Sequence, residues 1–320
     1  MEKKLFSQIG FVLFTVMAIA AALQLALMYG LPILTGGENS AFSSSWVMWL
    51  TTFVPLYLVA VPVGQWRFGR IPSEPRQENR LGAGNFLSIL LICFPIMYGG
   101  NIVGFLLSYV LSGGTAENGL LDYIFDANPM KVVVVVILAP IIEEYIFRKQ
   151  IIDRSAKYGE KPAIFFSAAA FALFHGNLLQ FFYAFGLGLV FAYVYTRTGR
   201  LRYSIALHAI INFMGSVVAP WVLSFVDLEA LTRMGAANPG DISAYRDIIP
   251  GLLIFGLYGL LLLGLSVTGL VLLIVKSRKL VFLPAAEEIQ KGRRFRTVYL
   301  NPGVILYVLL CLGIIVFSLL

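Results

Sequence analysis

The chain has few charged residues and very few cysteines or histidines. Of its 320 residues, 13% are charged and 59% are hydrophobic, whereas about a quarter of a soluble domain is charged. Its two cysteines, Cys93 and Cys311, both lie in apolar runs, which argues against a disulfide framework and against a thiolate metal site. The sequence HExxH, the metal-binding helix motif of soluble zinc proteases, is absent. Together these deficits exclude an ordinary soluble enzyme.

Long apolar runs are abundant. A run of roughly 18 or more apolar residues spans a hydrocarbon core of ~30 Å as a helix, because lipid cannot satisfy a bare backbone. The candidate spans are 5–34, 46–66, 86–111, 131–148, 162–175, 178–196, 203–226, 251–275 and 303–320. The first is too long for a signal peptide, so we expect it to be retained. The prediction is an all-α, polytopic integral membrane helical bundle with about eight to nine transmembrane helices.

Basic residues are distributed very unevenly between the predicted loops. If the N-terminus is cytoplasmic and the chain changes sides at every span, all basic residues except Lys131, Arg233 and Arg246 fall inside, which is 21 of 24. This predicts a multi-pass protein of the cell membrane with basic cytoplasmic loops. Loops of this kind, next to anionic headgroups, also explain the net charge of +7, and no nucleic-acid partner is expected.

Two adjacent carboxylates, Glu143 and Glu144, fall inside a predicted span. An ionisable group there costs at least ~2.5 kcal/mol, so it is a functional-site hypothesis by default. Glu144 and Arg148 are four residues apart and share a helix face, which allows them to pair, either as a structural ion pair or in support of a site. Glu143 points ~100° away and lacks that partner.

Both histidines, His175 and His208, also fall in predicted spans, and Asn212 shares a helix face with His208. A buried glutamate base, imidazoles and an amide around one water are the groups that hydrolysis requires. Alternatively, Glu143, His175 and His208 would ligate a zinc ion that holds the water. Taken singly, each histidine is also compatible with a satisfied core residue, and Asn212 with a hydrogen bond between helices.

These residues carry a family resemblance. The segment Glu143-Glu144-Tyr-Ile-Phe-Arg148 resembles the motif EExxxR, Phe171 to His175 resembles FxxxH, and His208 to Asn212 resembles HxxxN. In this order, on successive helices, they are the motifs of the CPBP family of intramembrane proteases, also called the ABI or type II CAAX prenyl endopeptidase family. The resemblance covers residues 85–226 and no recognisable motif lies outside it.

The resemblance implies a peptidase. In it Glu143 activates water, while His175, His208 and Asn212 order that water and the oxyanion, with Glu144, Arg148 and Phe171 in support. Eukaryotic relatives remove the last three residues of prenylated CAAX proteins, and bacterial relatives are implicated in bacteriocin immunity and surface-protein processing. The cofactor is left open between none and Zn²⁺, because both have been argued for the family.

We expect three parts along the chain. Residues 1–84 form N-terminal transmembrane helices and a basic cytoplasmic loop, 85–226 the protease core, and 227–320 a loop and C-terminal helices. The expected partners are a membrane-associated protein or peptide substrate, with or without an attached lipid, and membrane lipid itself, with the oligomeric state left open. Two alternatives are a proton-coupled transporter, since buried Glu and His also form proton relays, and a non-catalytic scaffold or immunity protein.

The predicted depths of the site residues disagree. From the cytoplasmic ends of their spans, Glu143 and His208 lie about five residues or ~7.5 Å deep, but His175 lies ~20 Å deep. We therefore expect the helix of His175 to begin outside the bilayer, and the site to lie towards the cytoplasmic face.

Overall fold

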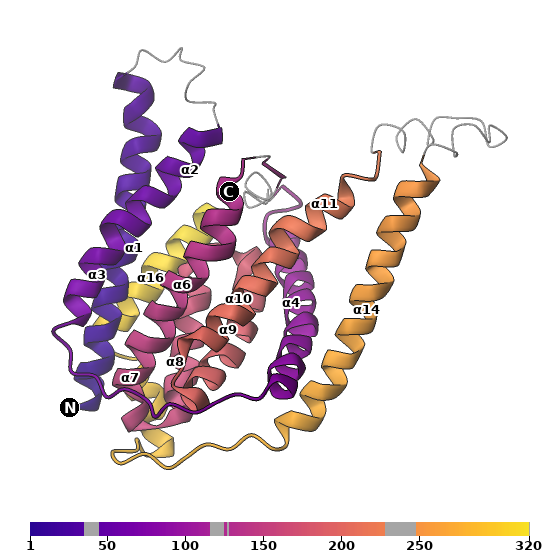
Figure 1. The fold of residues 1–320 in the computed structure, drawn as a ribbon. Coiled ribbons are helices and arrows are strands. Elements are labelled where there is room, and N and C mark those ends of the chain that lie inside the picture. Colours follow the sequence, from indigo (N-terminus) through magenta and orange to yellow (C-terminus); the bar gives the residue numbers. More distant parts are fainter. Residues whose placement is uncertain (35–44, 116–124, 127, 228–247, 320) are drawn as a thin grey trace.

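The protein folds as a bundle of helices. A computed structural model describes residues 1–34, 45–115, 125–126, 128–227 and 248–319, and these contain no strand, which confirms the predicted all-α class (Figure 1). Six helices of this described part are long and apolar enough to cross a membrane. The number is seven if Lys291–Val298 and Pro302–Phe317, which meet at 62°, form one bent span.

The predicted count of eight to nine transmembrane helices was therefore too high. The predicted spans 131–148 and 162–175 are helical but are not among the six. The first carries four charged residues, Lys131, Glu143, Glu144 and Arg148, more than an apolar span has. The second belongs to a helix of 15 residues, or ~22 Å, which is shorter than the hydrocarbon core.

The first half of the bundle contains three long helical rods. Its elements are α1 (Glu2–Leu34), then α2 (Ser45–Phe53), η2 (Val54–Ala60) and α3 (Val61–Phe68) in one rod, then α4 (Ala83–Leu111). The central run of the chain is η3 (Val132–Leu138), α6 (Ala139–Glu144), η4 (Tyr145–Gln150), α7 (Ile151–Ser155) and η5 (Ala156–Tyr158). It carries both glutamates of the EExxxR motif.

The second half of the chain contains the remaining helices of the bundle. Its elements are α8 (Glu160–Phe174), α9 (Leu178–Thr198), α10 (Leu201–Phe213), η6 (Met214–Val218), α11 (Ala219–Leu223), α14 (Ile249–Ser277), η7 (Lys291–Arg293), α15 (Arg294–Val298) and α16 (Pro302–Phe317). In Figure 1, α8, α9 and α10 stand in the centre, α1 and α16 on one side, and α4 and α14 on the other.

Glycines allow the helices to approach closely. A Cβ atom on Gly303 would overlap the Ser7 backbone, so α16 packs directly against α1. Gly100 and Gly104 of α4 likewise face the backbone of α9 at Tyr183 and Leu179. Small residues at such contacts are the ordinary means of association in lipid, where apolar burial alone gives no driving force.

Helix lengths remove the disagreement in depth. The helical run that carries Glu143 continues past the predicted end at 148 to Ser155, which places Glu143 twelve residues or ~18 Å from its end. Since α8 begins at Glu160, His175 lies fifteen residues or ~22 Å from the same end of the bundle. The error was in the boundary of the predicted span 131–148.

Four segments of the bundle are π-helical. A π turn adds one residue per turn and leaves backbone carbonyls without their usual partners, and such segments are frequent at functional sites. Three of them, η2, η3 and η6, contribute residues to a single cavity, and η3 and η4 flank the glutamates on either side. The irregular helices therefore surround one place in the bundle.

Candidate active site

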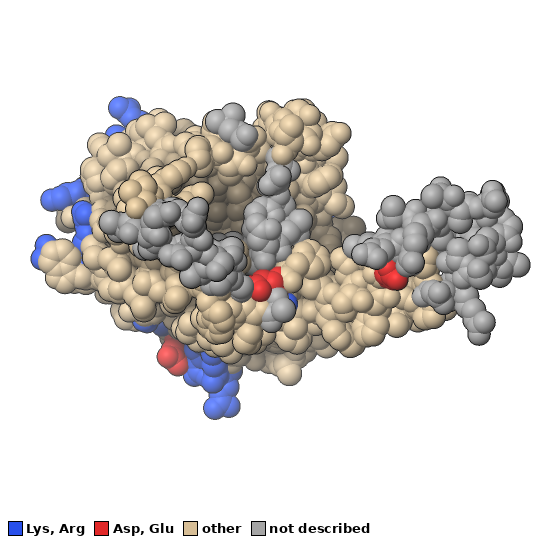
Figure 2. All heavy atoms as spheres, turned by 90° about the horizontal axis from the view of Figure 1, so that it is seen from above, with Lys and Arg blue, Asp and Glu red and all other residues tan. Residues whose placement is uncertain are grey.

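A cavity of about 1040 Å³ lies between α2, α4, α6, α8, α9, α10 and the end of α16. Seen from above, a hollow lies between the described residues at this end of the molecule (Figure 2). The cavity wall includes five of the residues singled out in the sequence: Glu143, Phe171, His175, His208 and Asn212. Glu144 and Arg148 do not line it.

Glu144 is at the centre of a buried network. Arg148 donates to it twice, from Nε to Oε2 at 2.9 Å and from Nη2 to Oε1 at 3.1 Å. Both side chains are fully buried, and the predicted pair is confirmed. Arg148 also donates to Ser167 Oγ at 3.1 Å, so its charge is compensated by several partners. A buried ion pair needs such additional bonds to offset the loss of water.

The same carboxylate also orients His208. Nδ1 of His208 donates to Glu144 Oε1 at 3.2 Å, which places the ring proton on Nδ1 and leaves Nε2 as an acceptor. The ring is stacked at 5.5 Å on Phe191 and meets Phe171 edge-on at 5.6 Å. Nε2 points toward Glu143, whose Oε2 is 3.8 Å away.

His175 has the same tautomer for a different reason. It follows the last residue of α8, and its Nδ1 donates to the Phe171 carbonyl at 2.8 Å. Because a carbonyl oxygen can only accept, Nε2 of His175 carries no proton. The Gly176 that follows has φ of 64°, a left-handed conformation that ends the helix and returns the chain into α9.

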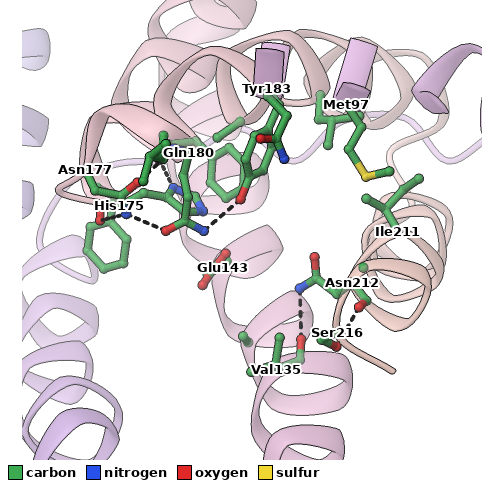
Figure 3. A pocket seen from close by; sticks show the side chains of 18 of the residues that line it. Met97, Val135, Glu143, His175, Asn177, Gln180, Tyr183, Ile211, Asn212 and Ser216 are labelled. Carbon is green, nitrogen blue, oxygen red and sulfur yellow. Dashed lines mark hydrogen bonds between the residues drawn. The ribbon is translucent and has the colours of Figure 1, made fainter. Parts of the chain in front are cut away.

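Glu143 lines the cavity beside Tyr57, a residue that none of the three sequence motifs includes. The Tyr57 hydroxyl is within interaction range of the Glu143 carboxylate. Tyr57 comes from η2, outside the predicted core 85–226. Figure 3 shows Glu143 between the α9 side of the cavity, with His175 and Gln180, and the Asn212 side.

An aromatic ladder positions Tyr57. Its ring is stacked at 5.7 Å on Phe53, which is stacked at 5.1 Å on Trp49. Trp49 donates from Nε1 to Asp126 Oδ2 at 2.6 Å, which fixes the far end of the ladder. The aromatic spacing of four residues was visible in the sequence, but apolar residues at that spacing occur on any buried helix face.

The Asn212 side chain contacts both the π-helical segment η3 and the cavity. Its Nδ2 donates to the Val135 carbonyl at 2.8 Å, in the middle of η3. The interpretation of Asn212 as a bond between helices is therefore correct, and the same side chain also lines the cavity. An amide nitrogen has two protons, so one remains for a ligand.

A second polar group was missed by the motifs. Asn177 accepts from the Gln180 backbone at 2.8 Å, capping α9, and donates from Nδ2 to Gln180 Oε1 at 2.5 Å. Gln180 Nε2 in turn donates to the Tyr183 hydroxyl at 2.8 Å, which leaves the Tyr183 proton directed elsewhere (Figure 3). All three line the cavity. Asn after a glycine could have been recognised as a helix cap, but not as part of a site.

The ligand set proposed for zinc does not form a metal centre in this arrangement. Among the described residues, no three His, Cys, Asp or Glu side chains are grouped closely enough to hold a metal ion. Glu144, which lies nearest to His208 Nδ1, is already occupied by Arg148. Glu143, His175 and His208 are therefore not grouped as a zinc site in the described part of the chain.

Comparisons with known proteins agree with the motifs. Residues 126–214 match the family model described as type II CAAX prenyl endopeptidase Rce1-like. The chain is 28% identical over 213 residues to "Putative membrane peptidase YdiL" of Bacillus subtilis (strain 168), an alignment that covers 52% of this chain and 85% of the relative. Both findings support the resemblance of this chain to the CPBP family. No solved structure matches the chain.

The CPBP match contains all seven motif residues but not Tyr57. Together with the apolar helices, it identifies an integral, multi-pass membrane protein. The division into parts at 84 and 226 stays a prediction, although α1 and α16, from opposite ends of the chain, pack side by side.

The buried network around Glu144 gives a stability prediction. Arg148→Met should lower the free energy of unfolding by about 3–5 kcal/mol, because it leaves the Glu144 carboxylate buried without its cation. The double variant Arg148→Met/Glu144→Gln should recover much of that loss, since no charge remains to be compensated. Thermal unfolding of the detergent-solubilised proteins measures both. Equal stability of the single and double variants would contradict a paired charge.

Proposed function

We propose that the protein is an intramembrane endopeptidase in which Glu143 activates a water molecule for attack on a peptide bond. The supporting observation is the juxtaposition of the Glu143 carboxylate with His208 Nε2, at 3.8 Å, on the wall of a cavity. A water placed between them would donate one proton to Glu143 and one to His208. It would thus present a lone pair to the substrate.

The two histidines serve as acceptors in this proposal. Both rings carry their proton on Nδ1, so both Nε2 atoms orient water rather than stabilise an anion. Glu144 and Arg148 support the site through His208, and Phe171 supports it by packing against both imidazole rings.

The oxyanion requires donors, and two side chains on the cavity wall offer them. These are Asn212, through its second amide proton, and Tyr183, through its hydroxyl. A donor aimed at the developing charge in a site of low dielectric constant is usually the largest single contribution to such a reaction. This assigns Asn212 the role that its motif implies.

The proposed reaction balances without a further reactant. The water oxygen bonds to the scissile carbonyl carbon while Glu143 takes a water proton. The carbon–nitrogen bond then breaks, and Glu143 returns that proton to the leaving nitrogen. The products are a carboxylic acid and an amine, and the glutamate is regenerated.

The proposed substrate is a membrane-associated protein or peptide. Glu143 is the single charged side chain among the described residues that line the cavity, and most of its neighbours are apolar or aromatic. Such a cavity favours an uncharged segment around the scissile bond, because a charge there would lose its water without gaining a partner.

The first test removes the proposed base. Glu143→Gln should lower peptide cleavage by at least ~10²-fold, the usual contribution of a general base, while thermal unfolding stays close to that of the parent. The assay uses purified protein with fluorogenic peptides, with and without a C-terminal farnesyl group. Glu287→Gln, on an exposed loop carboxylate, is the matched control. Undiminished cleavage by Glu143→Gln would refute the mechanism, and complementation of a deletion strain by this variant would favour a scaffold.

The second test concerns the tyrosine that positions Glu143. Tyr57→Phe keeps the stacking on Phe53 but removes the hydroxyl next to the Glu143 carboxylate, and kcat should fall about 10-fold, which corresponds to ~1.4 kcal/mol. KM and the unfolding temperature should not change. A rise in KM with constant kcat would instead assign Tyr57 to substrate binding.

The third test addresses the metal. Because the donor set does not group around one point, we expect cleavage to survive dialysis against a chelator, with less than one metal ion per active protein by elemental analysis. Activity lost on chelation and restored by Zn²⁺ would require Glu143, His175 and His208 to move together. It would replace the proposed mechanism with a metal-bound water.

A further inference from the structure

The basic loops of the chain meet at one end of the bundle. Ion pairs join the loops around residues 69–82, 156–160, 197–202 and 278–293. Lys157 pairs with Glu74 at 3.0 Å and with Glu287 at 3.8 Å. The other pairs are Arg76 with Glu160 at 2.7 Å, Arg197 with Glu160, and Arg200 with Glu78 at 3.0 Å. Lys276 donates to Asn85 Oδ1 at 3.1 Å and brings the start of α4 and the end of α14 to the same end. The grouping expected from charge is therefore present in the fold.

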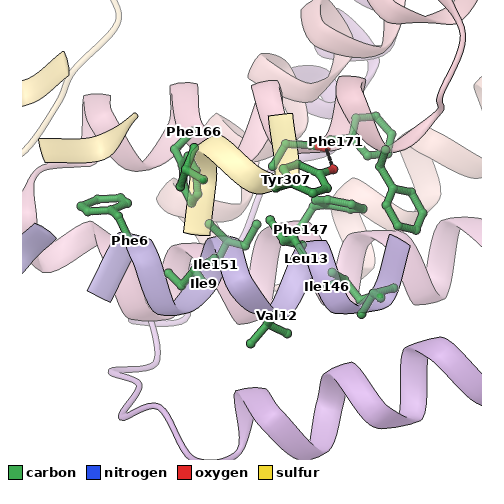
Figure 4. Close-up of a cluster of buried hydrophobic side chains, with 14 of the residues drawn as sticks. Phe6, Ile9, Val12, Leu13, Ile146, Phe147, Ile151, Phe166, Phe171 and Tyr307 are labelled. Carbon is green, nitrogen blue, oxygen red and sulfur yellow. Dashed lines mark hydrogen bonds between the residues drawn. The ribbon is translucent and has the colours of Figure 1, made fainter. Parts of the chain in front are cut away.

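The cavity is closed towards this basic end. Directly below Glu143 and Phe171, the side chains of Phe147, Phe166 and Phe6 are at most 2% exposed. Phe147 meets Phe171 edge-on at 5.3 Å, and Phe166 meets Phe6 in the same way at 5.3 Å (Figure 4). This packed layer, with the Glu144–Arg148 pair beside it, separates the cavity from the basic loops.

The cavity instead extends to the opposite end of the helices. Its lining includes Ser108 of α4, which lies 23 residues or ~35 Å along the helix from Asn85. Met28 of α1 and Ser318, just after α16, also belong to the lining. A length of ~35 Å exceeds the ~30 Å hydrocarbon core, so the wall reaches the interface away from the basic loops.

Charge confirms the difference between the two ends. No Lys or Arg occurs among the described residues that line the cavity. In the view onto this end, most of the visible Lys and Arg atoms lie at the margins of the described surface (Figure 2). The expectation that the site faces the basic loops was based on span boundaries that placed Glu143 closer to those loops than its helix does.

We propose that the cavity is entered from the non-cytoplasmic face of the membrane. Basic loops are retained on the cytoplasmic side, and the cavity opens at the other end. The inference rests on the proposed function for its substrate class: an uncharged peptide segment of a protein anchored at, or exported to, the non-cytoplasmic face. A cytoplasmic protein with a lipidated C-terminus would approach the closed end.

Thiol labelling in bacterial protoplasts tests the orientation of the entrance without relying on activity. The native thiols of Cys93 and Cys311 are fully buried and give no background. Ser318→Cys places a thiol at the cavity entrance, and Ser73→Cys places one on the exposed basic loop. A membrane-impermeant maleimide should label Ser318→Cys in intact protoplasts and Ser73→Cys only after permeabilisation.

Two results would overturn the proposal. One is labelling of Ser73→Cys in intact protoplasts, and the other is labelling of Ser318→Cys only after permeabilisation. Asn101→Cys, an exposed residue of α4 that also lines the cavity, is a second variant in case Ser318→Cys fails to fold, and it should behave in the same way. Both measurements can succeed when Glu143→Gln remains active, so failure of the entrance and failure of the mechanism are distinguishable.

Discussion

The buried carboxylate of Glu144 is the interaction on which the site depends. It accepts from Arg148 on its own helix and from His208 on α10, and so it joins two elements that are 64 residues apart in sequence. The cost of burying this charge is offset only while all these bonds are made. The helix of the glutamates, the imidazole and, through Ser167, the helix α8 are thereby held in one relative position, and the neighbouring Glu143 is fixed with them.

Much of this could be predicted from the sequence because lipid limits the choices. A backbone in hydrocarbon must be helical, and a charge there must have a partner, so a pair at four-residue spacing such as Glu144 and Arg148 is a strong indication. The gathering of the basic loops at one end followed from the same reasoning. Five of the seven residues in the three motifs line the cavity.

The number of membrane spans, the role of Tyr57 and the closed end of the cavity could not be predicted from local sequence patterns. The number of full crossings was overestimated because the run 131–148 carries four charged residues and α8 is shorter than the hydrocarbon core. Tyr57 was missed because its partner lies 86 residues away and its own span carries no motif. The closed end of the cavity is formed by the packing of Phe147, Phe166 and Phe6, which side-chain shape decides and periodicity does not.

The bond between Asn212 and Val135 has a consequence for how such a sequence can change. One amide proton satisfies a carbonyl that the π-helical geometry of η3 has released, and the other is directed to the cavity. Deleting a residue in η3 to restore regular α-helix would remove the acceptor and release the amide to rotate. Substituting the asparagine would leave the carbonyl unsatisfied in lipid. The irregularity of one helix and the functional group on another therefore form one structural unit, so that a change in either removes a hydrogen-bond partner of the other.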